Sequence, residues 1–168
     1  YETRSEANLK EVGAYEYARH PSTKILCAAW RYARRSKLRE TKTRVWSPAL
    51  DPFGSGISEE LHMALKMSEL DRTVLVAHNA LFEQVISEHV LYRGCRYEIP
   101  VESWYCTAAA AASLALPRDL EGACNAINLS AKKDTEGRKV MLKLTKPRKA
   151  TKNNPAKWHN LRADLDRL

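Results

Sequence analysis

The sequence lacks several features that would place it in a well-known class. No hydrophobic run approaches the length of a membrane span, and the first residues, YETRSEANLK, contain no apolar core of the signal-peptide kind. The four cysteines are scattered without a CxxC pair, which argues against a zinc site and against a disulfide framework. We interpret them as small buried apolar residues of a protein in a reducing compartment.

Common catalytic motifs are also missing. The five histidines show neither an HExxH pattern nor another metal-ligand spacing, and the chain has no GxSxG and no GxxxxGK[ST] segment. The short glycine pattern in DPFGSG, residues 51–56, is more typical of a surface turn than of a phosphate cradle. Zinc proteases, serine hydrolases and P-loop enzymes are therefore disfavoured.

What the chain does contain is enough apolar sequence for one globular domain. It has 168 residues, of which 44% are hydrophobic and 29% charged. The net charge of +8 comes from one basic segment, residues 132–158, which holds ten Lys or Arg against two acidic residues. Such a segment with an interleaved Trp is typical of a polyanion-binding surface, most often for nucleic acid. A solvated loop whose lysines only confer solubility is the alternative.

Hydrophobic patterning predicts an α/β fold. Runs that are apolar throughout, such as TVLVA, suit strands covered on both faces, whereas helical spacing of apolar residues marks the segments between them. The expected strands are 25–30, 43–47, 73–77 and 104–107, with Glu2 at the tail of a first strand. A turn or short helix is expected near 7–15. The other expected helices are one capped by Ser58, then 80–92, 108–116, 119–129, one or two turns in the basic segment, and one beginning at 161.

The stretch VAHNALFEQV, residues 76–85, carries the first candidate site. Asn79 follows an apolar strand directly, and Glu83 lies four residues later on the same face of the expected helix. Open α/β sheets usually bind ligands at the carboxyl ends of their strands, where this amide and carboxylate would lie, with Phe82 beside them. The alternative is a helix cap by Asn79, with Glu83 as a surface residue.

Glu2 could supply a second carboxylate to that site. Two carboxylates from separate segments, beside an amide, form a plausible site for Mg²⁺, which prefers oxygen ligands and keeps waters or substrate phosphates in its remaining positions. In isolation, Glu2 is more typical of an ordinary exposed residue than of a metal ligand.

Several blocks, in this order, resemble a known family. They are YETRSEANL at residues 1–9, AHNALFE at 77–83, WYCTA at 104–108, LPRDLE at 116–121, and the stretch KVMLKLTKPRK with NNPAKWH that follows. Together they resemble the 3′–5′ exonuclease (proofreading) region of phage-type family A, DNA polymerase I-like, DNA polymerases of the DEDD superfamily. The resemblance covers essentially the whole chain.

The resemblance implies a ribonuclease H-like fold, with a mixed central sheet flanked by helices, in a single domain over residues 1–168 that is truncated at both ends. It implies a two-ion site for Mg²⁺ or Mn²⁺ held by four carboxylates. Glu2 matches the Glu of the first motif, Asp-x-Glu, and Thr3 would lie against the terminal nucleotide. Asn79 and Phe82 match the second motif, Asn-x-x-aromatic-Asp, in which Glu83 stands where Asp is usual. The remaining two carboxylates would precede Tyr1 and follow Leu168.

The function implied is metal-dependent release of nucleoside 5′-monophosphates from the single-stranded 3′ end of DNA, as the proofreading part of a polymerase. Partners would be DNA and a polymerase region of the same longer chain, with no membrane, in the cytoplasm of a bacterial or phage-infected cell. Two alternatives stay open: an inactive exonuclease-like module that binds DNA or has a structural role, and a basic protein-interaction domain. The residues expected to contact the nucleic-acid backbone are Lys143, Lys146, Arg148, Lys149 and Lys152.

Overall fold

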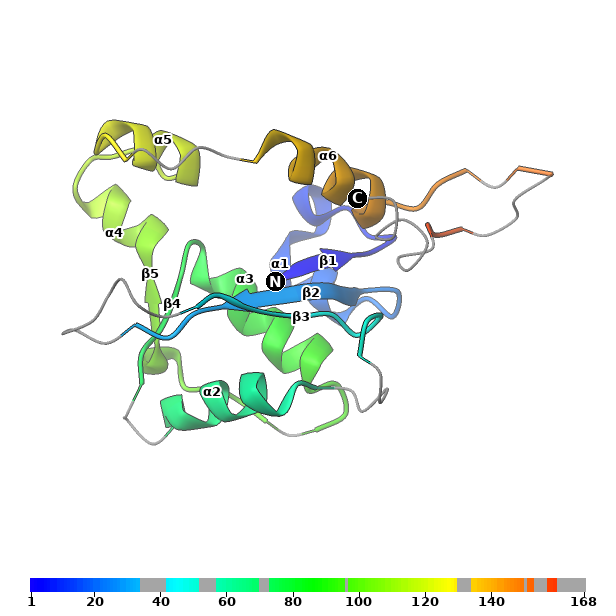
Figure 1. Cartoon of the computed structure of the whole chain (residues 1–168), viewed down its shortest axis with the longest axis horizontal. Coiled ribbons are helices and arrows are strands. Elements are labelled where there is room, and N and C mark those ends of the chain that lie inside the picture. The colour runs from blue at the N-terminus through cyan, green and yellow to red at the C-terminus, as the bar shows by residue number, and fades with distance from the viewer. Residues whose placement is uncertain are drawn as a thin grey trace. The chain divides into compact units, whose positions relative to one another are not determined.

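The computed structural model describes residues 1–33, 42–51, 57–69, 73–95, 97–129, 134–149, 151–152 and 157–159. The chain forms two compact units, the first made of Tyr1–His62 and Val140–Leu168, the second of Met63–Lys139. Figure 1 shows the elements in chain order by colour. The α/β class is confirmed, because both units combine strands with helices; the single domain over residues 1–168 stays a prediction. None of the helices formed by the described residues is long and apolar enough to cross a membrane.

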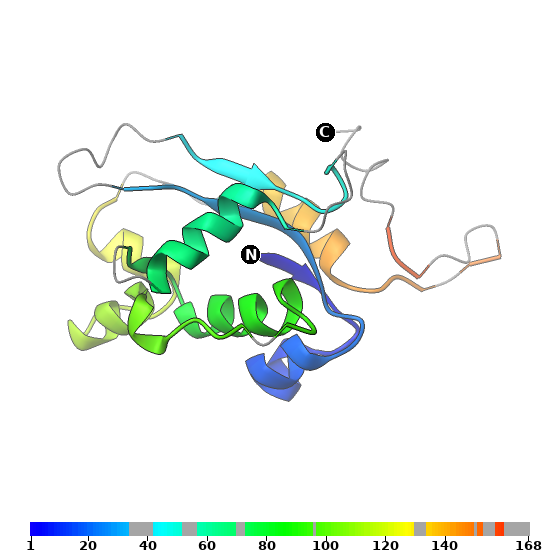
Figure 2. The same ribbon diagram turned by 90° about the horizontal axis from the view of Figure 1, so that it is seen from below.

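The first unit contains a three-stranded antiparallel sheet with β2 in the middle (Figure 2). Its strands are β1 (Glu2–Arg4), β2 (Lys24–Trp30) and β3 (Arg44–Trp46). Glu2 lies opposite Cys27, but Thr3 lies opposite Ile25, so the register shifts between Glu2 and Thr3. Irregularities of this kind re-aim side chains and are frequent beside active sites.

Between β1 and β2 runs α1 (Leu9–Arg19), longer than the short helix expected from the sequence. The side chain of Asn8 caps its first turn by accepting a hydrogen bond from the backbone N–H of Lys10. Gly13 interrupts the helix with a φ of 77°, a backbone conformation that glycine adopts without a steric penalty.

Buried hydroxyl groups join β1, α1 and β2. The Thr3 hydroxyl lies 3.0 Å from the Tyr17 hydroxyl, and both side chains are buried. Thr23, with no exposed surface, places its hydroxyl 2.7 Å from Ser5 Oγ and 2.5 Å from the carbonyl oxygen of Tyr17. Because buried polar groups are costly when unpaired, these bonds fix how β1 sits against α1.

Replacing Thr23 by valine, which keeps the shape but removes the hydroxyl, should destabilise the protein by about 1–3 kcal/mol. The Tyr17 carbonyl and Ser5 hydroxyl would then be buried with one partner fewer. Chemical denaturation followed by circular dichroism measures the change. Thr43→Val, at an exposed position, is the matched control and should alter stability by less than about 0.5 kcal/mol.

The second unit is built on a parallel pair of strands, β4 (Leu75–Ala77) and β5 (Trp104–Cys106). Each strand leads into a helix, and Figure 1 shows β5 running directly into the helix that follows it. The helical segments are α3 (Ala80–Ile86), a π-helical turn (Ser87–Leu91), a 3₁₀ turn (Val101–Ser103), α4 (Thr107–Ser113) and α5 (Leu120–Ala126). The predicted helix over 80–92 is confirmed, with a change of winding after Ile86.

Two further helices contain the boundaries between the units: α2 (Glu59–Glu69) and α6 (Thr135–Thr145). The latter is the helix of the basic segment and is longer than the one or two turns expected. Asp134 accepts hydrogen bonds from the backbone N–H groups of Glu136 and Gly137 at its start, and Leu144 is buried near its end.

Two expectations about burial are wrong. The strand predicted at 73–77 is not covered on both faces, since Val74 and Val76 are 61% and 63% exposed. The cysteines are not buried either: Cys95 is exposed and the other three are partly exposed. Apolar character alone therefore did not predict burial here. The helix expected from residue 161 lies outside the described residues.

Candidate functional site

The carboxyl ends of β4 and β5 lie at the same edge of the parallel pair. Ala77, the last residue of β4, is paired with Cys106, the last residue of β5. Helices α3 and α4 begin immediately afterwards, at Ala80 and Thr107. This is the edge at which open α/β sheets usually bind ligands.

Asn79 occupies the N-cap position of α3 in an unusual conformation. Its φ and ψ are 68° and 53°, the left-handed region, and its exposed side chain makes no capping hydrogen bond. Asn is one of the few residues other than Gly that tolerate this conformation. The alternative in which the Asn79 side chain caps the helix is therefore not met.

Phe82 and Glu83 lie in the first turn of the same helix. The backbone N–H of Phe82 donates to the carbonyl oxygen of Asn79 over 2.9 Å, which closes this turn. Both side chains are partly exposed. Glu83 is the acidic residue of this first turn, close to the point where the strand ends.

The His78 side chain connects the end of β4 to the start of α4 and to Arg118. Its Nδ1 lies 3.0 Å from the Thr107 hydroxyl, at the start of α4, and its Nε2 lies 2.8 Å from the carbonyl oxygen of Arg118. A carbonyl oxygen only accepts, so Nε2 carries the hydrogen. The Thr107 hydroxyl also lies 3.3 Å from the carbonyl oxygen of Ala77. These contacts hold His78, the residue directly before Asn79, in place.

Cys106 lies at the same edge, facing the starts of both helices. Its sulfur accepts a hydrogen bond from the backbone N–H of Ala80 over 3.4 Å. Burial acts to raise the pKa of the thiol, but backbone N–H groups of Asn79, Ala80, Ala108 and Ala109 outweigh it, and the pKa is lowered.

Cys27, in the first unit, shows the opposite effect. Burial raises the pKa of its thiol, and the negative charge of Glu2, its partner across the strands, raises it further. Burial also raises the pKa of Tyr17, to which Glu2 again adds. The carboxylate of Glu2 is thus close enough to act on both groups, although the Glu2 side chain itself is exposed.

The two thiols should differ in reactivity. At about pH 7.5 a thiol of lowered pKa holds more thiolate, so Cys106 should react with iodoacetamide about 10-fold faster than Cys27, whose thiol is also the more buried of the two. Mass spectrometry of peptides after timed labelling measures both rates, and unfolding in urea should bring them together. Equal rates in the folded protein would contradict the assigned environments.

Thr3 is buried rather than presented on the surface. Its side chain is 5% exposed, and its hydroxyl is bonded to Tyr17. This contact gives Thr3 a structural role in holding β1, next to Glu2. Contact between Thr3 and a nucleotide stays a prediction.

The predicted backbone-contact residues all belong to the first unit, at the end of α6 and just after it. Lys143, Lys146, Lys149 and Lys152 are exposed, and Arg148 is partly exposed. Between residues 146 and 159 the sequence has five Lys or Arg and no acidic residue. This stretch of sequence is therefore strongly basic.

The structure brings Asn79, Phe82 and Glu83 together on one helical turn, whereas Glu2 and Thr3 lie on β1 of the other unit. Convergence of Glu2 and Glu83 stays a prediction. Among the residues that the structure describes, no group of three or more His, Cys, Asp or Glu is arranged to hold a metal ion.

A comparison with curated proteins gives one informative match. A DNA polymerase of Bacillus phage SP02 is 30% identical to the chain over 161 residues, which is 95% of the chain. The chain is similar to one segment of a DNA polymerase. It spans 22% of that polymerase's length, and the similarity supports a polymerase-related domain. No protein-family model matches the chain, and no solved structure matches it.

Two features of this domain had weak sequence signals. His78, which follows β4, belongs to no metal-ligand spacing in the sequence, and its two hydrogen bonds span 29 and 40 positions of sequence. The contacts made by Arg4 and Glu6 with residues near the end of the basic segment had no signal beyond the interleaved Trp158.

Proposed function

We propose that this polymerase-related domain is a metal-dependent 3′–5′ exonuclease that removes nucleotides from the single-stranded 3′ end of DNA. In this role it would proofread for a polymerase region of the same longer chain. The observation that carries the proposal is the position of Glu83. It follows the carboxyl end of β4 by one helical turn, beside an Asn79 whose side chain is not used for capping. The similarity to a segment of a DNA polymerase supports the same proposal.

The donor set fits Mg²⁺ or Mn²⁺. The carboxylates of Glu2 and Glu83 are hard oxygen ligands, and Mg²⁺ is commonly held by one or two carboxylates, with water and substrate phosphate in the other positions. When bound, two such ions would supply charge stabilisation to both the attacking and the leaving oxygen of the phosphodiester. The proposal requires β1 and β4 to place Glu2 and Glu83 at one site.

The other residues of the proposed site would bind and orient the DNA strand. The amide of Asn79 would orient the terminal nucleotide or a carboxylate, and the ring of Phe82 would pack against the sugar or base, which tolerates any sequence. His78 would keep Asn79 in its left-handed conformation through its bonds to Thr107 and Arg118. Thr3 would lie against the terminal nucleotide.

Lys143, Lys146, Arg148, Lys149 and Lys152, termed the phosphate contacts from here on, would hold the DNA backbone. Four of them lie between residues 146 and 159, where the sequence has five Lys or Arg and no acidic residue. Binding through such contacts releases counterions, so affinity for DNA should fall steeply with salt. This charge also supports the second candidate function, a module that binds DNA without cleaving it.

Labelled single-stranded DNA separates the two functions. With Mg²⁺ or Mn²⁺ and a chain extended by its natural flanking residues, the exonuclease should shorten DNA from the 3′ end and release nucleoside 5′-monophosphates. DNA that is bound but stays intact would support the binding module. An Asp before Tyr1 and a Tyr-x-x-x-Asp after Leu168 in the longer reading frame would favour the enzyme.

A further inference from the structure

Four of the five phosphate contacts lie in residues 146–157, termed the basic stretch from here on. Residues at or next to both of its ends are bonded to other parts of the first unit. Just before it, the carbonyl oxygen of Thr145 accepts a hydrogen bond from the backbone N–H of Ser5 over 3.4 Å. Across it, the backbone N–H of Arg148 donates to the carbonyl oxygen of Lys157 over 3.0 Å. Arg148 and Lys157 are therefore joined by a backbone hydrogen bond.

Its far end is held by Arg4 and Glu6, which lie two and four positions after Glu2. The Lys157 ammonium lies 2.5 Å from a carboxylate oxygen of Glu6. The Arg4 guanidinium lies over the Trp158 ring, 4.9 Å from its centroid, which is within the range of a cation–π contact. Three consecutive residues, Arg4, Ser5 and Glu6, thus hold the two ends of the basic stretch.

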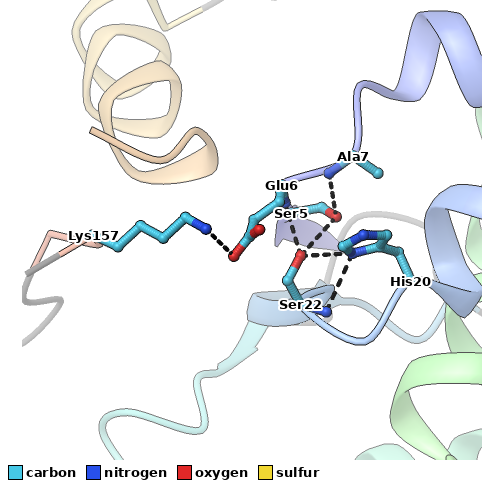
Figure 3. Close-up of polar contacts among 6 residues, drawn as sticks. All are labelled: Ser5, Glu6, Ala7, His20, Ser22 and Lys157. Carbon is cyan, nitrogen blue, oxygen red and sulfur yellow. Dashed lines mark hydrogen bonds and ion pairs between the residues drawn. The ribbon is translucent and has the colours of Figure 1, made fainter. Parts of the chain in front are cut away.

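Glu6 is presented from a well-bonded turn (Figure 3). Its backbone N–H donates to Ser22 Oγ over 2.8 Å, and the same oxygen lies 2.8 Å from Nδ1 of His20 and 3.3 Å from Ser5 Oγ. The Ser5 hydroxyl also accepts from the backbone N–H of Ala7. Figure 3 shows Lys157 reaching across from its own segment to the Glu6 carboxylate.

An exposed ion pair of this kind contributes little to overall stability, so stability does not account for its arrangement. Its effect would instead be to restrict the conformations of the basic stretch. Ordering a loop on binding lowers affinity, and a loop that is already held loses less freedom when a ligand binds.

We propose that Glu6 is a positioning residue for nucleic-acid binding: by holding Lys157, with Arg4 on Trp158, it pre-orders the phosphate contacts for a single-stranded DNA backbone. This inference rests on the proposed function, because it takes the phosphate contacts to bind DNA. Glu6 itself does not touch the strand. The ionic and cation–π contacts are termed the latch from here on.

The proposal predicts a change in DNA affinity opposite to the change expected from net charge alone. Glu6→Gln makes a basic protein one charge more positive, which by itself should leave DNA binding unchanged or tighten it. Loss of the latch should instead weaken the affinity for a labelled oligothymidine about 3- to 10-fold. Fluorescence anisotropy in EDTA measures binding without any cleavage.

Matched variants isolate the latch. Glu16→Gln removes the same charge from the same unit, at an exposed pair with Arg19, and should not weaken binding. The reversed pair, Glu6→Lys with Lys157→Glu, keeps the net charge and should restore most of the affinity. Trp158→Ala should weaken binding as Glu6→Gln does, whereas Trp158→Phe keeps an aromatic face for Arg4 and should not.

A second measurement needs no DNA. Hydrogen exchange at the Arg148 amide, which is bonded to Lys157, should accelerate in Glu6→Gln and not in Glu16→Gln. Equal affinity and equal exchange in these two variants would overturn the latch. If the wild type bound no DNA, or if replacing the phosphate contacts left affinity intact, the proposed DNA binding would fail as well. If only the latch proposal were wrong, replacing the phosphate contacts would still lower the affinity for DNA.

Discussion

Replacing Glu83 by glutamine is expected to lower the rate of 3′-end cleavage at least about 100-fold, because the substitution removes a negatively charged oxygen ligand while preserving the shape of the side chain. Binding of single-stranded DNA should change less than about 2-fold, since the proposed phosphate contacts lie elsewhere in the sequence. Cleavage is followed on end-labelled DNA with Mg²⁺ or Mn²⁺, and binding by anisotropy in EDTA.

Glu88 provides the matched control for this prediction. It lies on the helical segment that continues α3 and hydrogen-bonds with the side chain of Gln84. Glu88→Gln makes the same change of charge five residues on and should leave cleavage near the wild-type rate. Glu83→Asp keeps the carboxylate and should retain measurable cleavage. Full activity in Glu83→Gln would mean that the catalytic site is elsewhere.

Replacing Lys146, Arg148, Lys149 and Lys152 together by glutamine is expected to weaken single-stranded DNA binding about 100- to 1,000-fold at low salt. If all four neutralise phosphates, the slope of log affinity against log salt should fall in magnitude by about 3, at about 0.7 per contact. A titration at several salt concentrations measures both quantities. Cleavage at saturating DNA should be affected much less than affinity.

The control for that variant replaces four exposed cations at other places in the first unit, Lys10, Arg19, Lys24 and Lys42. The change in net charge is identical, so any general electrostatic effect is reproduced. If this control loses as much affinity and as much salt dependence, the binding is diffuse and the phosphate contacts are misassigned. Retained affinity in the first variant would contradict them directly.

Sequence reasoning located the elements that present the candidate site, because local patterns specify them. The apolar run before His78 and the helical spacing after Asn79 predicted β4 and α3, and the short run at 104–107 predicted β5. The identities of Asn79 and Glu83 gave their chemistry. The left-handed backbone of Asn79, which distinguishes it from a side-chain cap, is a conformational property that spacing does not determine.

Long-range contacts were not predictable from the sequence. The exposure of Val74 and Val76 depends on what packs against β4, and a run of apolar residues reads the same in either case. The partial exposure of Cys27 and Cys106 has the same cause. The latch joins residues about 150 positions apart, Arg4 with Trp158 and Glu6 with Lys157, so neither periodicity nor spacing could reveal it.

The central claim is that the carboxylates of Glu2 and Glu83 share divalent cations. Crystals of the chain with its natural flanking residues, soaked in Mn²⁺, test it most directly through the anomalous scattering of the ion. The account predicts manganese density with oxygens of both Glu2 and Glu83 within about 2.0–2.3 Å, the distance typical of hard-cation ligands. Carboxylates held far apart, with manganese at neither or at only one of them, would contradict it.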